Sequence, residues 1–162
     1  MQFEIRRAVS GDEPVLRTLR LQALTDSPNA FSSTYELELA RTYEEWQRWL
    51  TISVTFLLEA GGEPRGLACG VPDSHDSSVV HLMSMWVHPD LRGTGAAQAL
   101  VASVKTSAAE AGAKQVRLEV VASNERAIRC YERAGFRATG RQSVLEKSGD
   151  LKIEMAWDTS AE

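Results

Sequence analysis

Two glycines stand two residues apart in the short segment Arg92-Gly-Thr-Gly-Ala-Ala97, between an apolar run and a long amphipathic stretch. Glycine has no Cβ, so Gly93 and Gly95 let a ligand approach the backbone closely. If the segment opens a helix, its first-turn amides have no partner inside the helix and point outward with the positive end of the dipole. Such a turn suits a pyrophosphate. Arg92 adds a cation that can pair with phosphate oxygens.

Two other phosphate-binding loops do not fit this segment. No Gly-Lys-Ser/Thr follows the glycines, so the lysine and the magnesium-binding hydroxyl of a nucleoside triphosphatase are missing. The three-glycine fingerprint of dinucleotide-binding proteins is also missing. Taken alone, the segment remains open to a plainer interpretation, a glycine-rich corner between a strand and a helix that binds nothing.

The elements that would position this turn can be read from hydrophobic periodicity. Alternation predicts strands near 2–9, 54–60, 65–71, 79–87, 116–120, 136–145 and 151–157. Helical spacing predicts helices from about Asp12 to Leu24, from Thr42 onward, from 94 to 111 and from 124 to 134, with residues 27–35 forming an ordered loop. Asp12 is a plausible cap, and Thr42 with Glu45 matches a capping box. This order predicts a mixed α/β domain built on one sheet.

The composition bounds the remaining possibilities. The 162 residues fit a single domain, 1–162, and the hydrophobic share of 43% and charged share of 25% are ordinary for a globular protein. The net charge of −4 argues against a nucleic-acid partner and suits a neutral or cationic one. Cys69 and Cys130 lack metal-ligand spacing, so we expect small buried hydrophobes and no metal site. Without a signal region or a membrane-length apolar run, we expect a cytoplasmic protein with no membrane partner.

Two segments together resemble a known family. Arg92-Gly-Thr-Gly-Ala-Ala97 resembles the Arg/Gln-x-x-Gly-x-Gly/Ala loop of the GCN5-related N-acetyltransferase (GNAT) family, with Ala97 in place of the commoner glycine. Asn124-Glu-Arg-Ala-Ile-Arg-Cys-Tyr-Glu-Arg-Ala-Gly-Phe136 is similar to its second signature, Asn-x-x-Ala-x-x-x-Tyr-x-x-x-Gly-Phe. The element order covers nearly the whole chain, and the match is closest between residues 79 and 140.

The resemblance implies the acyl-CoA N-acyltransferase fold. This is a single mixed, mostly antiparallel sheet of six to seven strands flanked by about four helices, splayed where the strand ending at Val87 diverges from the one ending near Val121. It also implies acetyl-CoA as co-substrate and an amine, on a small molecule or a protein, as acceptor. Dimers are common in the family, so the resemblance allows a homodimer. The residues that it places against the coenzyme are Met85, Trp86, Val87, Arg92, Gly93, Thr94, Gly95, Ala96, Ala97, Asn124 and Tyr131.

Acetyl transfer to an amine sets three chemical requirements. The attacking amine must be uncharged, although a lysine-like amine is mostly protonated at neutral pH. The developing oxyanion needs a donor, which a free backbone N–H near Val87 could supply. The leaving thiolate needs a proton, which Tyr131 could donate as general acid unless it is simply a core tyrosine. Since both reactants bind together, we expect direct transfer without an acyl-enzyme. Cys130 does not suit a nucleophile, because it lies about 100° around the helix from Tyr131.

The sequence leaves the general base and the acceptor site open. His81 and Glu119, on neighbouring predicted strands, are candidate bases, while a structural role is the plainer interpretation of a lone strand histidine. The 27–35 loop and the final hairpin would hold the acceptor by analogy with the family. Trp46 and Trp49 either line that site or pack in the core. Glu36 and Glu38 either attract a cationic amine or are exposed carboxylates on a solvated segment.

Two other functions remain open at this stage. One is a non-catalytic acyl-CoA-binding sensor or regulatory module of the same fold, which would bind the coenzyme tightly and transfer nothing. The other is a structural or interaction domain with no coenzyme. A thermal shift separates the second from the others, because a ligand at a hundred times its dissociation constant stabilises a protein by about 2.7 kcal/mol.

Overall fold

A computed structural model describes residues 2–160. Within them the chain forms seven strands and five α-helices, besides two short 3₁₀ helices at Pro28–Ala30 and Pro89–Leu91. In chain order the main elements are β1 (Glu4–Arg7), α1 (Glu13–Asp26), α2 (Tyr35–Leu39), α3 (Tyr43–Ile52), β2 (Val54–Ala60), β3 (Glu63–Pro72), β4 (Val79–Val87), α4 (Ala96–Glu110), β5 (Gln115–Val121), α5 (Glu125–Arg133), β6 (Arg137–Leu145) and β7 (Asp150–Asp158).

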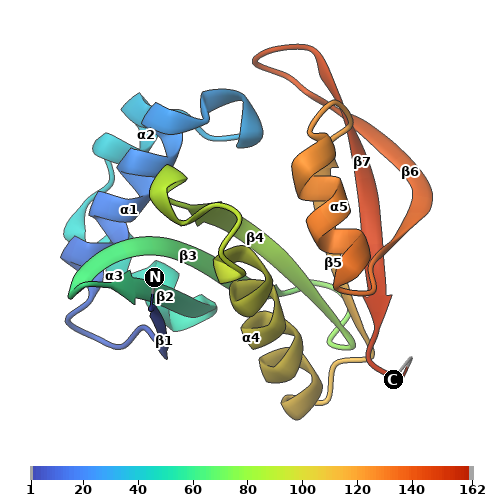
Figure 1. The fold of residues 1–162 in the computed structure, drawn as a ribbon, viewed down its shortest axis with the longest axis horizontal. Coiled ribbons are helices and arrows are strands. Elements are labelled where there is room, and N and C mark those ends of the chain that lie inside the picture. The colour runs from blue at the N-terminus through green and yellow to red at the C-terminus, as the bar shows by residue number, and fades with distance from the viewer. Residues whose placement is uncertain (1, 161–162) are drawn as a thin grey trace.

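All seven strands join one sheet, in the order β1-β2-β3-β4-β5-β7-β6. The β4–β5 pair is parallel, and every other neighbouring pair is antiparallel. Figure 1 shows the two halves of this sheet turning away from each other above the middle of the molecule, between β4 and β5. The predicted fold class, a mixed and mostly antiparallel splayed sheet, is confirmed.

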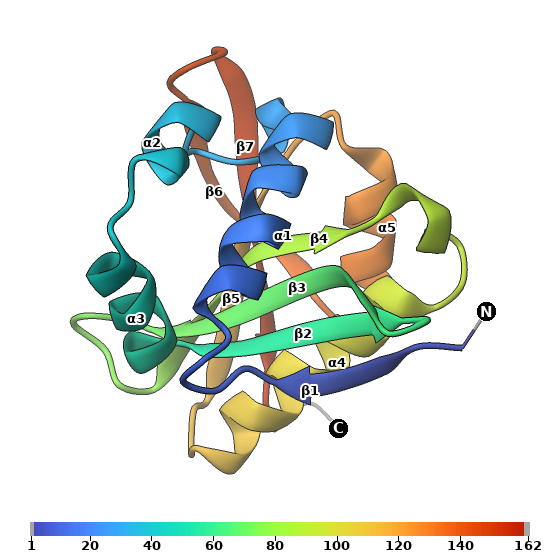
Figure 2. The same ribbon diagram turned by 90° about the vertical axis from the view of Figure 1, so that its left-hand side faces the viewer.

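Helices cover both faces of the sheet (Figures 1 and 2). On one face α4 packs through Leu100, Val101 and Val104, which are almost completely buried. On the other face α1 packs through Leu16 and Leu19, which share a second core cluster with residues of α3, β2, β3 and β4. Both contacts follow from apolar residues at helical spacing, as the sequence predicts. The central strands are therefore fixed from both sides, and they carry the site described below.

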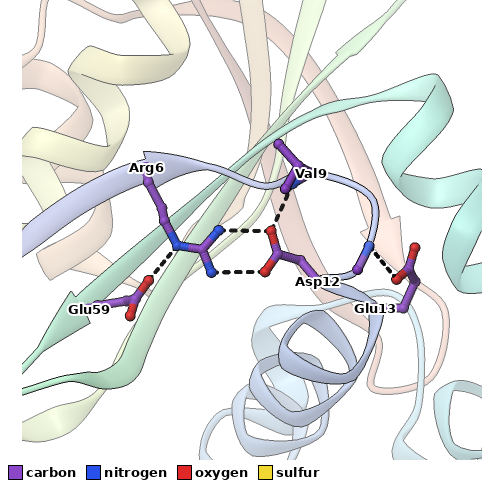
Figure 3. A network of polar contacts seen from close by, with 6 residues as sticks. Arg6, Val9, Asp12, Glu13 and Glu59 are labelled. Carbon is purple, nitrogen blue, oxygen red and sulfur yellow. Dashed lines mark hydrogen bonds and ion pairs between the residues drawn. The ribbon is translucent and has the colours of Figure 1, made fainter.

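The start of α1 differs from the prediction. Asp12 occupies the N-cap position, but its carboxylate makes no capping bond to the helix. Instead it accepts two hydrogen bonds from the Arg6 guanidinium, both of 2.8 Å, and one from the Val9 amide (Figure 3). Arg6 also pairs with Glu59 of β2. The carboxylate therefore ties the start of α1 and the turn before it to β1 at the edge of the sheet. A capping rule based on residue type cannot anticipate this contact.

The capping box at Thr42 is confirmed, because its hydroxyl accepts from the Glu45 amide and the Glu45 side chain accepts from the Thr42 amide. The predicted ordered loop at 27–35 is only partly right. Its last residue begins a five-residue helix, α2, whose N-cap Thr34 accepts a hydrogen bond from the Leu37 amide. A helix this short has too few residues to establish a periodic pattern, which is why the sequence predicts about four helices and the structure has five.

Candidate active site

The site begins where β4 and β5 part. The two strands pair at only three positions, ending with His81 opposite Arg117. Beyond that point each strand continues for several residues, to Val87 and Val121, without the other as a partner. The result is a cleft of about 780 Å³ lined by both strands, the 27–33 segment, α5 and the start of α4. Edges of a sheet that face such a cleft leave backbone N–H and C=O groups available to a ligand.

A β-bulge contributes to the divergence of β4. Leu67 pairs with Trp86 and Cys69 with Met83, so two residues of β4 oppose one residue of β3. One of the two is Ser84, whose φ of 57° is the one positive φ of a non-glycine residue within residues 2–160. A bulge bends its strand and increases the local twist, and bulges are frequent next to active sites. The sequence shows no sign of it.

The end of β4 presents polar backbone groups to the cleft side. The His88 amide bonds the Arg65 carbonyl at 2.7 Å, so the polar groups of His88 face β3. Because these groups alternate between the two edges of a strand, those of Val87 face away from β3. The Val87 carbonyl accordingly accepts a hydrogen bond from Arg92 Nε at 3.2 Å. The Val87 N–H is therefore a candidate for the free backbone donor expected near Val87.

The turn before α4 has the backbone geometry expected of a phosphate cradle. Gly93 and Gly95 have φ of 81° and 89°, the left-handed region that favours glycine. A Cβ built at either position would meet no atom within 4 Å, so the space in front of the turn is open. Thr94 donates its amide to the Leu91 carbonyl. Within this turn and the first turn of α4, the amides of Gly93, Gly95, Ala96, Ala97 and Gln98 find no acceptor among the described residues.

Arg92 makes contacts within the protein. Its guanidinium bonds the Asp26 carboxylate at the end of α1, in addition to the Val87 carbonyl. Asp26 also accepts from the Trp86 indole N–H at 3.0 Å. These two bonds, the Trp86 one foremost, and a third from Ser27 lower the pKa of Asp26 to about 2, against the smaller opposing effect of burial. The carboxylate therefore joins α1 to β4 and to the turn, so Arg92 positions the turn as well as lying at its rim.

On the opposite wall, α5 carries Tyr131, Cys130 and Asn124. Tyr131 is 8% exposed, packs edge-on against Phe136 and lines the cleft. Burial raises the pKa of Tyr131, and the neighbouring Cys130 adds to the effect, so the hydroxyl stays protonated at neutral pH. Asn124 is the N-cap of α5 and accepts from the Ala127 amide at 3.2 Å. It lies on the cleft wall.

The cysteines differ from each other. Cys69 is buried as expected, but Cys130 is only half-buried and lines the cleft beside Tyr131, so the expectation of two buried cysteines is wrong for Cys130. The separation of Cys130 and Tyr131 around the helix therefore does not keep Cys130 out of the cleft. Burial nonetheless raises the pKa of the Cys130 thiol, which disfavours the thiolate that a nucleophile requires.

The two candidate bases lie on facing strands in different surroundings. His81 stands at the last paired position of β4, and its Nε2 lies 2.7 Å from the Asp73 carboxylate. That bond, together with the amides of His75 and Asp76, lowers the pKa of Asp73 to about 2. Glu119 of β5 is exposed, accepts a hydrogen bond from Ser143 at 2.8 Å and lies 3.6 Å from Lys152 Nζ. Both side chains line the cleft.

The side of the cleft away from the turn is formed by α1, α2, α3 and the segment between α1 and α2. Trp49 lines the cleft, whereas Trp46 is 2% exposed and belongs to the core. The two alternatives for this pair therefore hold for one tryptophan each. Glu36 is exposed as expected. For Glu38 both expectations are wrong, because it is 1% exposed and paired with Arg20 and Arg41.

Sequence reasoning missed Arg20 and Asp73 as site residues. The signal for Arg20 was present, since it follows Leu16 and Leu19 on the apolar face of the first helix. A charged residue on such a face is buried only when it is paired. Asp73 lies in the polar turn before β4, and no spacing rule connects it with His81, because an antiparallel strand connection brings them together.

Two further observations concern the described part of the chain alone. Within residues 2–160, no three or more His, Cys, Asp and Glu side chains are grouped so that they could hold a metal ion. Over the same range, every helix is too short or too polar to cross a membrane.

Comparison with known proteins agrees with this geometry. Residues 21–136 match the model of the Acetyltransferase (GNAT) family. Uncharacterized N-acetyltransferases of Mycobacterium bovis and Mycobacterium tuberculosis are 40% identical to the chain over 68 residues, 42% of this chain and 44% of each relative. The chain thus matches less than half the length of these relatives.

Solved structures cover nearly the whole chain. An acetyltransferase of the GNAT family from Streptococcus pneumoniae superposes with a TM-score of 0.82 at 18% identity, over 96% of this chain and 98% of that one. A proposed acetyltransferase of Salmonella typhimurium, solved with its cofactor acetyl-CoA, gives 0.81 at 18% identity, over 100% and 96%. At this identity the likeness establishes the fold, while the match over residues 21–136 establishes the family. The chain belongs to the GNAT acetyltransferase family.

Proposed function

We propose that the protein is an acetyl-CoA-dependent N-acetyltransferase that moves an acetyl group directly to a primary amine within a ternary complex. One observation carries the proposal. Ala97, one of the residues with an acceptor-free amide at the N-terminus of α4, and Tyr131, whose hydroxyl is protonated, line one cleft between two strands that separate. A diphosphate held at the turn and a reactive thioester placed at Tyr131 need both features together.

The chain offers contacts for the pyrophosphate and the pantetheine arm of the coenzyme, which supplies an acetyl group activated as a thioester. The turn from Arg92 to Ala97 would take the pyrophosphate on its free amides, since a helix N-terminus favours anions. The β4 backbone at Met85, Trp86 and Val87 would bond the pantetheine arm, and Asn124 would face that arm from α5. The open space in front of both glycines leaves room for such a ligand.

Tyr131 would act as the general acid. Its burial keeps the phenol neutral, so it holds the proton that the departing thiolate needs when the carbon–sulfur bond breaks. Glu119 is a weaker candidate for the base, because Lys152 and Ser143 already engage its carboxylate.

His81 would accept the proton that the amine loses as its nitrogen bonds the acetyl carbon. Asp73 is ionised at neutral pH and faces Nε2, so it favours the tautomer with the proton on Nε2 and leaves the lone pair of Nδ1 free. The Val87 N–H would donate to the carbonyl oxygen as negative charge develops there. Binding both reactants in one orientation supplies much of the acceleration.

The test combines calorimetry with turnover. We expect the purified protein to bind free and acetylated coenzyme, and to consume acetyl-CoA in the presence of at least one member of a broad amine panel. Tyr131→Phe should lower turnover about 10²- to 10⁴-fold with little change in coenzyme affinity. Tyr43→Phe is the matched control, because Tyr43 is exposed and lies outside the cleft. A folded protein that gives no heat with either coenzyme refutes the proposal.

Two further results separate the roles. Tight coenzyme binding without transfer to any amine would favour a sensor module over an enzyme. For the base, His81→Gln should alter the pH–rate profile, whereas an unaltered profile would eliminate His81 and leave Glu119 or water.

A further inference from the structure

The acceptor side of the cleft holds a buried cation with unused hydrogen-bonding capacity. Arg20, on α1, is 6% exposed and lines the cleft. Its Nε donates to Glu38 at 3.3 Å, while Nη1 is buried without a hydrogen-bond partner in the described structure. A buried guanidinium N–H that lacks an acceptor is costly, because it has lost water and gained nothing in return. Such an atom at the wall of a binding cleft indicates an anionic partner.

The charges around Arg20 do not balance. Glu38 is buried between two arginines, Arg20 and Arg41, so the three side chains carry a net charge of +1. Phe31 and Trp49 lie 4.9 Å and 5.6 Å from the Arg20 guanidinium carbon, offering aromatic faces and no anion. Burial lowers the pKa of Arg20, but a guanidinium remains charged at neutral pH. The group therefore keeps an excess positive charge where the acceptor would bind.

The rest of the cleft does not supply the missing anion. Five arginine or lysine side chains and two glutamates line it. One glutamate is Glu38, and the other, Glu119, is occupied by Lys152 and Ser143. Burial and, to a smaller extent, the Arg20 guanidinium lower the pKa of the Lys147 ammonium, against the opposing effect of Glu36, so a further cation lies within electrostatic reach of Arg20. An acceptor with a second positive charge would meet repulsion here, whereas one with an anionic group would be attracted.

We infer that the acceptor carries a carboxylate in addition to its amine, as a free amino acid does, and that Arg20 binds this carboxylate. The inference rests on the proposed function and specifies its substrate class. The carboxylate would accept a hydrogen bond from Nη1–H and offset the excess charge of the Arg20–Glu38–Arg41 group. A planar guanidinium matches a carboxylate with two parallel hydrogen bonds, which gives orientation as well as affinity. The amine would then point toward the strand edges and His81.

A purely structural role for Arg20 explains less. Its bond to Glu38 does join α1 to α2, but that bond engages only Nε. The bond accounts for Nε and leaves Nη1 unexplained. The two interpretations differ in a measurable way, since a structural role predicts equal kcat/KM values for acceptors with and without a carboxylate.

The first experiment uses the wild-type protein and matched acceptors. Each common amino acid that carries a primary α-amine is compared with its α-carboxamide and with the decarboxylated primary amine, and kcat/KM is measured by acetyl-CoA consumption. For the amino acids that are acetylated, we expect kcat/KM to exceed that of the carboxamide by roughly ten- to a hundredfold, the range for a hydrogen bond to a charged group. Carboxamides or decarboxylated amines that react as well as the acids overturn the inference.

The second experiment tests whether Arg20 is the side chain that causes the preference for acids over amides. Arg20→Gln should remove most of the acid-over-amide preference, mainly through KM, and leave coenzyme affinity unchanged. Arg17→Gln is the matched control, because Arg17 lies on the same helix outside the cleft. A preference that survives Arg20→Gln in the folded protein overturns the inference. If the variant does not fold, the wild-type comparison decides.

Coenzyme calorimetry separates the two possible failures. If the wild-type protein binds neither free nor acetylated coenzyme, the proposed function itself fails, and the substrate class with it. If it binds coenzyme and acetylates polyamines or carboxamides in preference to every amino acid, the inference about Arg20 fails alone.

Discussion

Asp26 provides a sharp test of how the coenzyme turn is held. Its carboxylate accepts from the Trp86 indole and from Arg92, two residues that the sequence predicts at the coenzyme. We expect Asp26→Asn to destabilise the protein, because the amide removes the negative charge that these donors stabilise. The folded pKa of about 2 lies roughly two units below the ordinary value of 3.8. At about 1.4 kcal/mol per unit, the upper bound is about 2.5 kcal/mol.

The expected effect is smaller than this bound. The Asp26 side chain is 27% exposed, so solvent screens the pair, and we expect about 1 kcal/mol at pH 7. Because the folded pKa is depressed, the contribution is present above the unfolded value of 3.8 and disappears as pH falls through the folded value near 2. About half of it should be gone by pH 3.

Urea denaturation of both proteins from pH 7 to pH 3 measures the difference directly. Asp90→Asn is the control, because Asp90 is an exposed carboxylate near the same turn, and it should change stability by less than about 0.5 kcal/mol. A wild-type advantage that stays constant across the whole pH range would refute the reasoning. So would an advantage near zero at pH 7.

Substitutions at three glycines make two further predictions. Gly95→Ala should weaken binding of free coenzyme at least tenfold by calorimetry. Gly112, at the other end of α4, has a similar φ of 87°. Each substitution should lower stability by about 1 kcal/mol, but Gly112→Ala should leave coenzyme binding intact. Equal affinities in the two variants would contradict a role for the turn in binding. Gly66→Ala should destabilise the protein by about 1–3 kcal/mol in urea titration, because its Cβ would lie 2.9 Å from the Trp86 carbonyl oxygen. A Gly66→Ala variant as stable as the wild type would show that β3 and β4 move apart freely at this point.

The parts of the fold that sequence could predict are those governed by local patterns. The alternation in 79–87 and 116–120 and the helical spacing in 94–111 correspond to β4, β5 and α4 within a few residues. The capping box at Thr42 is formed as expected, since both of its partners lie within one turn. Such features depend on neighbours in the chain, so residue type and spacing are sufficient.

The features that escaped prediction depend on contacts between distant segments. Asp26 meets Arg92 across 66 positions, and Asp73 meets His81 through a strand connection. The bulge at Ser84 arises from the register between β3 and β4, and no residue type in the sequence predicts it. The candidate site follows the same division. The turn and Tyr131 could be proposed from motifs, whereas the groups that orient them required the folded chain.

The charge of the acceptor shows why net charge is a poor guide to a ligand. The chain carries −4 overall, which on the sequence alone suits a cationic acceptor. At physiological ionic strength, exposed charges more than about 8 Å apart are largely screened, so the carboxylates spread over the surface act weakly inside the cleft. A buried group is screened much less. Arg20 and Glu38 are buried, and together with the partly exposed Arg41 they form a group that is cationic by one unit. If the acceptor proves to be an amino acid, its carboxylate will have been selected by this one local excess of positive charge, although the net charge of the whole chain is negative.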